Sequence, residues 1–180
     1  MKNLSYWLMK VRYKLKHNDK EVISEHFRKM GMKIGKRCNI CCNIATTQPF
    51  LIEMGDNVTI AGDVLLLTHD NSISKPLPNT TDLFGKIVIG ANCFIGTKSL
   101  IMPGVYLADN IIVAAGSVVT KSYRMRGIII GGNPAKIIGN VENFVERNKT
   151  NAFNLDNIPK ENQEIEIGQS KKLIIRKNGS

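Results

Sequence analysis

An aliphatic residue recurs at every sixth position through the middle of the chain. From residue 89 the series runs through six consecutive units: Ile89, Ile95, Ile101, Leu107, Val113 and Val119. A second series of small or aliphatic residues lies two positions before each of these: Ile87, Cys93, Ser99, Val105, Ile111 and Ser117. Alternation within each unit is typical of a strand, but a strict period of six is not typical of an ordinary antiparallel sheet.

The same six-residue period continues upstream of this block. Five further aliphatic positions follow it: Ile34, Ile40, Met54, Ile60 and Leu66. Thr46 occupies the slot after Ile40, and it lies eight residues before Met54 where the period requires six. We therefore predict that two extra residues bulge out of the repeat near Gln48 and Pro49.

These repeats predict a three-sided coil of parallel β-strands over residues 31–139. Each hexapeptide supplies one short strand and one corner, three hexapeptides close a turn, and successive turns pair about 4.8 Å apart. The aliphatic residue points inward, and the small residue that follows it, such as Gly90 or Gly96, relieves crowding at the corner. Only 6% of the residues are aromatic, so this core must be built from Ile, Val, Leu and small side chains.

The period breaks over residues 70–86, whose sequence is DNSISKPLPNTTDLFGK. Its Pro, Ser, Thr and Asn residues predict a loop, and a long loop ejected from a regular solenoid is more often functional than a tolerated insertion. The repeats end at residue 139. In the C-terminal extension of residues 140–180, NFVERNKT predicts a helical turn, while EIEI and KLIIR each predict a short strand.

Residues 1–30, which precede the coil, have a helical pattern. One apolar stripe recurs at spacings of four, three and four: Leu4, Leu8, Val11 and Leu15. Because a solenoid needs a cap over its open end, we interpret this segment as a short helical cap. The alternative is a basic amphipathic helix bearing Trp7 on a membrane surface. We favour the cap, since helical apolar stripes are usually packing faces.

The chain of 180 residues has a formal net charge of +10. The basic excess is five in residues 1–30, four in residues 31–140 and one in residues 141–180. Such a charge suits nucleic acid, a membrane surface or a phosphate-bearing ligand. A nucleic-acid reader should concentrate basic residues with interleaved aromatics, which this distribution does not do. Basic residues interrupt every apolar stretch of MKNLSYWLMKVRYK, so no signal peptide is expected and we predict a cytoplasmic protein.

The sequence contains four cysteines: Cys38, Cys41, Cys42 and Cys93. In a cytosolic protein they remain reduced. The spacing Cys38-x-x-Cys41-Cys42 invites a zinc interpretation, but no second pair and no paired histidine follows at the usual distance. We expect the cysteines to be small fillers of a narrow core, and we expect no metal site.

Two segments of the sequence resemble the hexapeptide acyltransferase superfamily. They are IVIGANCFIGTKSLIMPGVYLADNIIVAAGSVVTK and, after it, GGNPAKIIG. The resemblance covers residues 30–139 and is sharpest to the sugar O-acetyltransferase branch. FRKMGMKIGKRCNI also looks like the start of the coil in polysaccharide O-acetyltransferases. The resemblance implies a left-handed parallel β-helix, acetyl-CoA as co-substrate and a sugar-like acceptor in polysaccharide biosynthesis. It also implies a homotrimer, with acetyl-CoA in the cleft between neighbouring coils.

The family's catalytic residue is a histidine just before the ejected loop, and the resemblance assigns this role to His69 in LLLTHDNS. The residues agree, because His69 is the only histidine of the repeat region and histidine ordinarily titrates near neutrality. It would deprotonate a hydroxyl that attacks the thioester, while backbone N–H groups stabilise the oxyanion. The alternative is a structural role, in which a histidine at a corner of the coil forms a hydrogen bond with the backbone. Asp56, Asp63 and Asp70 are candidate partners, and the sequence assigns none of them.

The resemblance also implies six positions that contact coenzyme A. Thr97 and Ala115 match contacts to the pantetheine arm, and Phe94 matches an aromatic beside the catalytic ring that is Trp in the sugar acetyltransferases. Three residues match the region of the pyrophosphate, adenosine and 3′-phosphate: Thr120, Lys121 and Lys136. For the two lysines, solvated surface charge is the alternative. Because SYRMRGIII is one residue longer than in the galactoside enzyme, Arg124 or Arg126 can share the phosphate role.

Two other functions stay open. One is an N-acetyltransferase on an amino sugar, whose acceptor is already nucleophilic. The other is a non-catalytic scaffold or polyanion-binding module. Two further functions fit the sequence less well. A β-helical carbonic anhydrase needs three histidines around a metal, and the coil has one. A serine acetyltransferase needs a longer helical domain before the coil. We interpret His17 and His26, in the helical region, as structural or surface residues.

Overall fold

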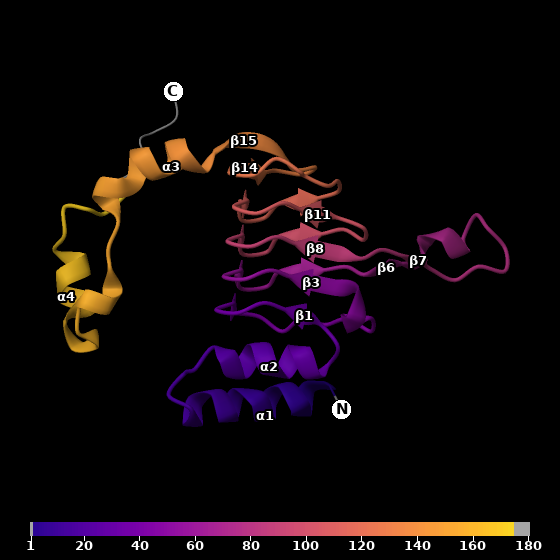
Figure 1. The fold of residues 1–180 in the computed structure, drawn as a ribbon, viewed down its shortest axis with the longest axis horizontal. Coiled ribbons are helices and arrows are strands. Elements are labelled where there is room, and N and C mark those ends of the chain that lie inside the picture. Colours follow the sequence, from indigo (N-terminus) through magenta and orange to yellow (C-terminus); the bar gives the residue numbers. More distant parts are fainter. Residues whose placement is uncertain (1, 175–180) are drawn as a thin grey trace. The chain divides into compact units, whose positions relative to one another are not determined.

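The computed structural model describes residues 2–174, which form two compact units divided between Val141 and Glu142. The first unit contains two helices and a stack of short strands, and the second contains helices and 3-10 turns (Figure 1). The strands of the coil form three ladders, which we call sides A, B and C. Side A consists of β1 (Lys33–Ile34), β3 (Ile52–Met54), β8 (Ile87–Ile89) and β11 (Tyr106–Leu107).

The other two sides are built in the same way. Side B consists of β2 (Asn39–Ile40), β4 (Thr59–Ile60), β9 (Phe94–Ile95), β12 (Ile112–Val113), β14 (Ile128–Gly131) and β15 (Lys136–Asn140). Side C consists of β5 (Leu65–Leu66), β10 (Leu100–Ile101) and β13 (Val118–Val119). Neighbouring strands within a side run parallel, and the pairing of β14 with β15 is antiparallel.

From β3 to β13, the strands of the coil occupy sides A, B and C in turn, so the chain coils around a three-sided core. Ile89 pairs with Leu107, and Ile95 pairs with Val113, so each partner lies three hexapeptides further along the chain. Three hexapeptides therefore close one turn. The parallel coil that the repeats predict is confirmed.

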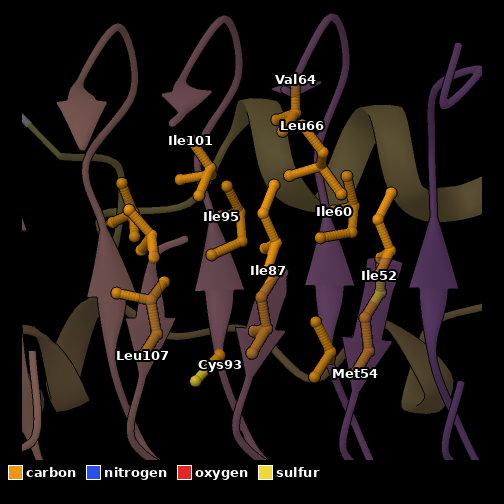
Figure 2. Packing of buried hydrophobic residues seen from close by; sticks show 14 of the residues in the cluster. Ile52, Met54, Ile60, Val64, Leu66, Ile87, Cys93, Ile95, Ile101 and Leu107 are labelled. Atoms are coloured by element: carbon orange, nitrogen blue, oxygen red, sulfur yellow. The ribbon is translucent and has the colours of Figure 1, made fainter. Parts of the chain in front are cut away.

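The inward-pointing series forms the core of the coil (Figure 2). Several of its side chains are fully buried: Ile60, Ile87, Ile95, Ile101, Leu107 and Ile111. Two serines share this interior, and their hydroxyls donate to the carbonyl of Ala114, at 3.0 Å from Ser99 and 2.6 Å from Ser117. Buried polar atoms are tolerated where they have such partners.

The corners of the coil require unusual backbone conformations. At eight corners, the third residue after the inward aliphatic residue has a positive φ: Arg37, Asn57, Asp63, Asn92, Lys98, Gly104, Asn110 and Gly116. Asn, Asp and Gly tolerate this region best. The small residue directly after the aliphatic one has a different purpose. A Cβ added at Gly96 would lie 2.5 Å from the backbone nitrogen of Ala115 in the next turn, so the stacking of turns requires a small residue there.

Two insertions interrupt the regular register. Ile34 pairs with Met54, two positions beyond the reach of three hexapeptides. The short 3-10 helix η1 (Pro49–Leu51) lies within this turn, as the spacing near Gln48 and Pro49 predicts. Leu66 pairs with Ile101, whereas three hexapeptides would reach only Phe84, so the larger insertion lies between those two strands.

The larger insertion is a hairpin rather than an irregular loop. Strands β6 (His69–Asp70) and β7 (Leu83–Phe84) pair antiparallel, and η2 (Asn71–Ser74) follows β6. We call residues 69–84 the hairpin arm, and Figure 1 shows it extending away from the coil. The N–H of Gly85 donates to the carbonyl of Thr68 at 3.0 Å and closes the base of the arm.

Helix α2 (Glu21–Lys29) packs against the first turn of the coil. Phe27 is fully buried and belongs to the same apolar cluster as Met32 and Ile34. The guanidinium of Arg28 donates to the carbonyls of Ile34 and Gly35, at 2.8 and 2.6 Å. Helix α2 thus occupies the place that the sequence assigns to a cap.

Helix α1 (Lys2–Leu15) packs on α2 (Figure 1), but not through the expected stripe. Met9 is buried and Tyr6 packs against the core cluster. The four residues predicted to form the packing face are exposed instead: Leu4, Leu8, Val11 and Leu15. That prediction is wrong because α2 already covers the coil, and α1 meets α2 through its other face.

The second unit begins one residue into α3 (Val141–Asn148) and also contains η3 (Lys149–Asn151), η4 (Leu155–Asn157), η5 (Lys160–Asn162) and α4 (Gln163–Gly168). The helical prediction for NFVERNKT is confirmed. The strand predicted for EIEI is wrong, because those residues lie in α4, where glutamate favours helix. Leu173 and Ile174 are not in a strand, and the rest of KLIIR lies outside the described residues. Within residues 2–174, no helix combines the length and apolarity needed to cross a bilayer.

Candidate active site

His69 stands where the chain leaves side C and enters the hairpin arm. Its side chain is exposed, and its backbone pairs with Phe84 across the arm. The two ring centroids are 6.2 Å apart with an interplanar angle of 42°. Phe84 thus limits the space open to the imidazole on one side.

The residue before His69 anchors this corner. Thr68 is buried, and its hydroxyl oxygen lies 2.7 Å from that of Thr46 in the preceding turn. The Thr68 hydroxyl also donates to the side-chain oxygen of Gln48 at 3.0 Å. Because these contacts fix the backbone at residue 68, the base of the arm starts from a defined position.

Asp70 is engaged locally. Its carboxylate accepts a hydrogen bond from the N–H of Ser72 at 2.8 Å. This bond and the nearby His69 lower the pKa of Asp70 below its ordinary value. The Asp70 carboxylate thus caps η2 and adds negative charge beside the imidazole.

The other two candidate partners of His69 lie at different corners. Asp56 lies between sides A and B, where its carboxylate accepts from the N–H of Lys36 at 2.8 Å. Asp63 lies between sides B and C. His69 lies between sides C and A, so stacking of turns does not bring Asp56 or Asp63 to it.

Thr97 and Ala115 stack at the corner between sides B and C. The N–H of Gly116 donates to the carbonyl of Thr97 at 2.8 Å, so the two corners are directly superposed in successive turns. Both side chains are exposed. The structure therefore brings together the two residues that match pantetheine contacts.

Thr120 and Lys121 lie on the other edge of side C, at the same corner column as His69. The ammonium of Lys121 is 5.7 Å from the ring centroid of Tyr123. The Tyr123 hydroxyl donates to the carbonyl of Ala135 at 2.5 Å, and Lys136 follows directly. Tyr123 thus joins the segments that carry the two lysines. Burial raises the pKa of Tyr123, which keeps its hydroxyl protonated as a donor.

The two arginines that follow are held elsewhere. The guanidinium of Arg126 forms an ion pair with Asp109 at 3.1 Å. The guanidinium carbon of Arg124 lies 5.1 Å from the ring centroid of Tyr106 on side A. Both arginines are exposed, but Arg124 is directed to side A and Arg126 to the corner between sides A and B.

Phe94 lies on the outer face of side B, where it is exposed. In a three-sided coil, side B is opposite the corner between sides C and A. Within one copy of the chain, the coil therefore separates Phe94 from His69. The aromatic ring that does lie beside His69 is Phe84, which the sequence reasoning missed. The hydrophobic pair Leu83–Phe84 after a turn-rich stretch could have indicated the returning strand of a hairpin.

The remaining histidines and cysteines are placed as follows. His26 packs edge-on against Phe27, with ring centroids 5.2 Å apart, and burial lowers the pKa of His26. His17 is exposed. Cys41 is exposed, in contrast to the three cysteines that fill the core as expected: Cys38, Cys42 and Cys93. In the described part of the chain, no group of three or more His, Cys, Asp or Glu side chains could hold a metal ion.

Known proteins resemble this chain in sequence and in fold. A family profile described as the hexapeptide repeat of succinyl-transferase matches residues 86–121. Protein CapG of Staphylococcus aureus is 39% identical over 144 residues, which cover 77% of this chain and 83% of CapG. The putative acetyltransferase YvoF of Bacillus subtilis is 32% identical, over 68% of this chain and 69% of YvoF. A maltose O-acetyltransferase from Clostridium difficile shares the fold, with a TM-score of 0.53 and 24% identity over 77% of this chain and 85% of that chain.

Proposed function

The chain belongs to the hexapeptide-repeat acyltransferase superfamily, in its sugar O-acetyltransferase branch, and from this premise we propose that His69 is the general base of an O-acetyltransferase. As a member of this family, the protein is an acetyl-CoA-dependent acetyltransferase. The acceptor that we propose is a hydroxyl group of a sugar or of a polysaccharide precursor. The position of His69 carries the proposal, because it is the single histidine of the coil and is exposed at the base of the arm.

The proposed reaction moves one acetyl group and one proton. His69 accepts the proton of the acceptor hydroxyl while its oxygen attacks the thioester carbonyl. The carbon–sulfur bond then breaks, and His69 returns the proton to the departing thiolate of coenzyme A. Backbone N–H groups stabilise the oxyanion between these steps. Two contacts support this role. Thr68 fixes the backbone before His69, and Phe84 flanks the His69 ring.

Six residues are the proposed contacts to coenzyme A. Thr97 and Ala115 line one edge of side C, and Thr120 and Lys121 line the other. The positive charges of Lys121 and Lys136, whose segments Tyr123 joins, suit phosphate groups. Phe94 belongs to the same proposed site.

The separation of Phe94 from His69 supports a site between copies of the chain. We propose a homotrimer in which side B of one copy brings Phe94 to the His69 corner of its neighbour. A closed ring of heterologous contacts repeats the same site three times. We also propose the left-handed sense of the coil, which the shared fold supports, and a cytoplasmic location.

The decisive assay measures thiol release from acetyl-CoA with a panel of sugar acceptors. We expect acceptor-dependent release that falls by about 10²-fold or more in His69→Ala, the range for loss of a general base. His17→Ala removes an exposed histidine outside the coil and should retain wild-type activity. Unchanged activity of His69→Ala would remove His69 from the mechanism. If release occurs only with amino sugars, the protein is an N-acetyltransferase instead.

The shared site has its own test. Light scattering should give three times the 20.0 kDa mass of the chain. His69→Ala and Phe94→Ala copies, each of low activity alone, should regain about a quarter of wild-type activity when unfolded and refolded together, since that share of interfaces has both native residues. Mixtures that stay as inactive as their components would place both residues in one copy's site. Full activity of Phe94→Ala alone would exclude Phe94 from the site.

A further inference from the structure

The outer face of α1 is an apolar stripe that no other described part of the first unit covers. Trp7, Leu8 and Leu15 are 60%, 54% and 76% exposed, and Leu4 and Val11 on the same face are also exposed. Residues at spacings of three and four share one face of a helix. A stripe of four aliphatic residues and a tryptophan facing water has a free-energy cost that a partner surface would remove.

The stripe cannot turn inward without breaking the packing of α1. On the opposite face, Met9 is buried and the Tyr6 ring lies 6.4 Å from that of Phe27 and 6.2 Å from that of His26. Arg12 also forms an ion pair with Glu25 of α2 at 3.3 Å. These contacts fix the rotation of α1 and keep the stripe outward.

Positive charge borders the stripe on both sides. Five basic residues precede Asp19, the first acidic residue of the chain: Lys2, Lys10, Arg12, Lys14 and Lys16. At 100° per residue, Lys10 and Lys14 flank the Trp7 edge of the stripe, while Arg12 flanks the Leu8 edge. These three side chains are exposed.

We propose that α1 is a docking helix for the surface of an anionic lipid bilayer, with its apolar stripe in the interface and its basic flanks on the headgroups. An apolar face bordered by Lys and Arg, with a tryptophan at its edge, is the pattern of a helix that lies in the plane of a membrane. The 14 residues of α1 span about 21 Å, so the helix lies along the surface rather than across it. A protein partner is disfavoured, because lysines are depleted in protein interfaces.

Trp7 is the only tryptophan of the chain, so its fluorescence reports on α1 directly. The full-length protein is titrated with vesicles of phosphatidylcholine alone or mixed with phosphatidylglycerol. We expect the Trp7 emission to shift to shorter wavelength, and the protein to sediment with the vesicles, only when the anionic lipid is present. High salt should weaken this binding. No shift and no sedimentation with anionic vesicles at low salt would overturn the proposal.

Matched variants separate the stripe from general stickiness. Leu8→Glu should lower vesicle binding by about tenfold or more, because it places a carboxylate in the stripe. Leu155→Glu makes the same change at a site of similar exposure (46%) in the second unit and should bind like the wild type. Lys10→Gln with Lys14→Gln should reduce binding to anionic vesicles. Equal losses in Leu8→Glu and Leu155→Glu would overturn the proposal, as would a lipid-independent Trp7 shift that grows with protein concentration. The readout needs no acetyltransferase activity, so this proposal can fail independently of the proposed function.

Discussion

The imidazole of His69 faces the ring of Phe84 across the base of the hairpin arm, with 6.2 Å between the ring centroids. This contact links the proposed general base to β7, the returning strand of the arm. That strand has no other role in the proposed reaction.

Phe84→Ala should lower kcat by about tenfold and leave KM for acetyl-CoA nearly unchanged, because the imidazole loses its lateral support. Steady-state kinetics as a function of pH measure this effect. Leu83→Ala, a change at the neighbouring and similarly exposed position, is the control and should have little effect. A rise in KM with constant kcat would assign Phe84 to substrate binding instead.

Gly96→Ala should destabilise the coil by about 1–3 kcal/mol. The new Cβ would lie 2.5 Å from the nitrogen of Ala115 and 2.7 Å from the carbonyl oxygen of Val113, and backbone cannot move aside as a side chain can. Gly62→Ala is the matched control, since a Cβ there meets nothing within 4 Å. Urea unfolding of the two variants should give clearly different midpoints. Similar midpoints would mean that the turns can separate without cost.

Glu53→Gln should reduce stability at neutral pH but not in acid. Lys33 and Lys86 both contact the Glu53 carboxylate, at 2.7 and 2.8 Å, and their hydrogen bonds lower its pKa below the ordinary value of 4.5. A lowered pKa in the folded state contributes stability above the unfolded pKa, and this contribution disappears as pH falls through the folded pKa. Thermal melts of the variant and the wild type should therefore differ at pH 7 and converge below about pH 3. A constant difference across this range would contradict the ion-pair explanation.

Thiol labelling should distinguish Cys41 from the other cysteines. Cys41 is exposed, whereas burial raises the pKa values of Cys38 and Cys42, and raises that of Cys93 to about 11. Since the thiolate is the reactive form, one thiol per chain should react rapidly at pH 8 and three more only after unfolding. Cys41→Ser should abolish the fast phase. A fast phase that survives this change would show that a second cysteine is accessible.

The coil could be predicted from the sequence because its signal is local and repeated. Each unit places an aliphatic residue and a small corner residue at fixed positions, so an exception such as Thr46 does not hide the period. Even the two-residue bulge near Gln48 could be counted, since the aliphatic positions on both sides keep their phase.

The contacts between separate elements could not be predicted in this way. The stripe of α1 has a packing pattern, but the sequence does not say which face of a helix its neighbour covers. The pairing of His69 with Phe84 depends on the arm folding back on itself, which no repeat encodes. The separation of Phe94 from His69 appears only when positions are assigned to the sides of the coil.

The register of the coil also bounds how such a chain can change in length. Within the sides, partners recur at every third hexapeptide, so a gain or loss inside a strand must come in whole turns if side chains are to keep facing inward. At a corner the restriction is lifted, as the additional residues near Pro49 and in the hairpin arm show. Recombination could therefore exchange one arm for another of different length and composition while the stacked turns stay in phase.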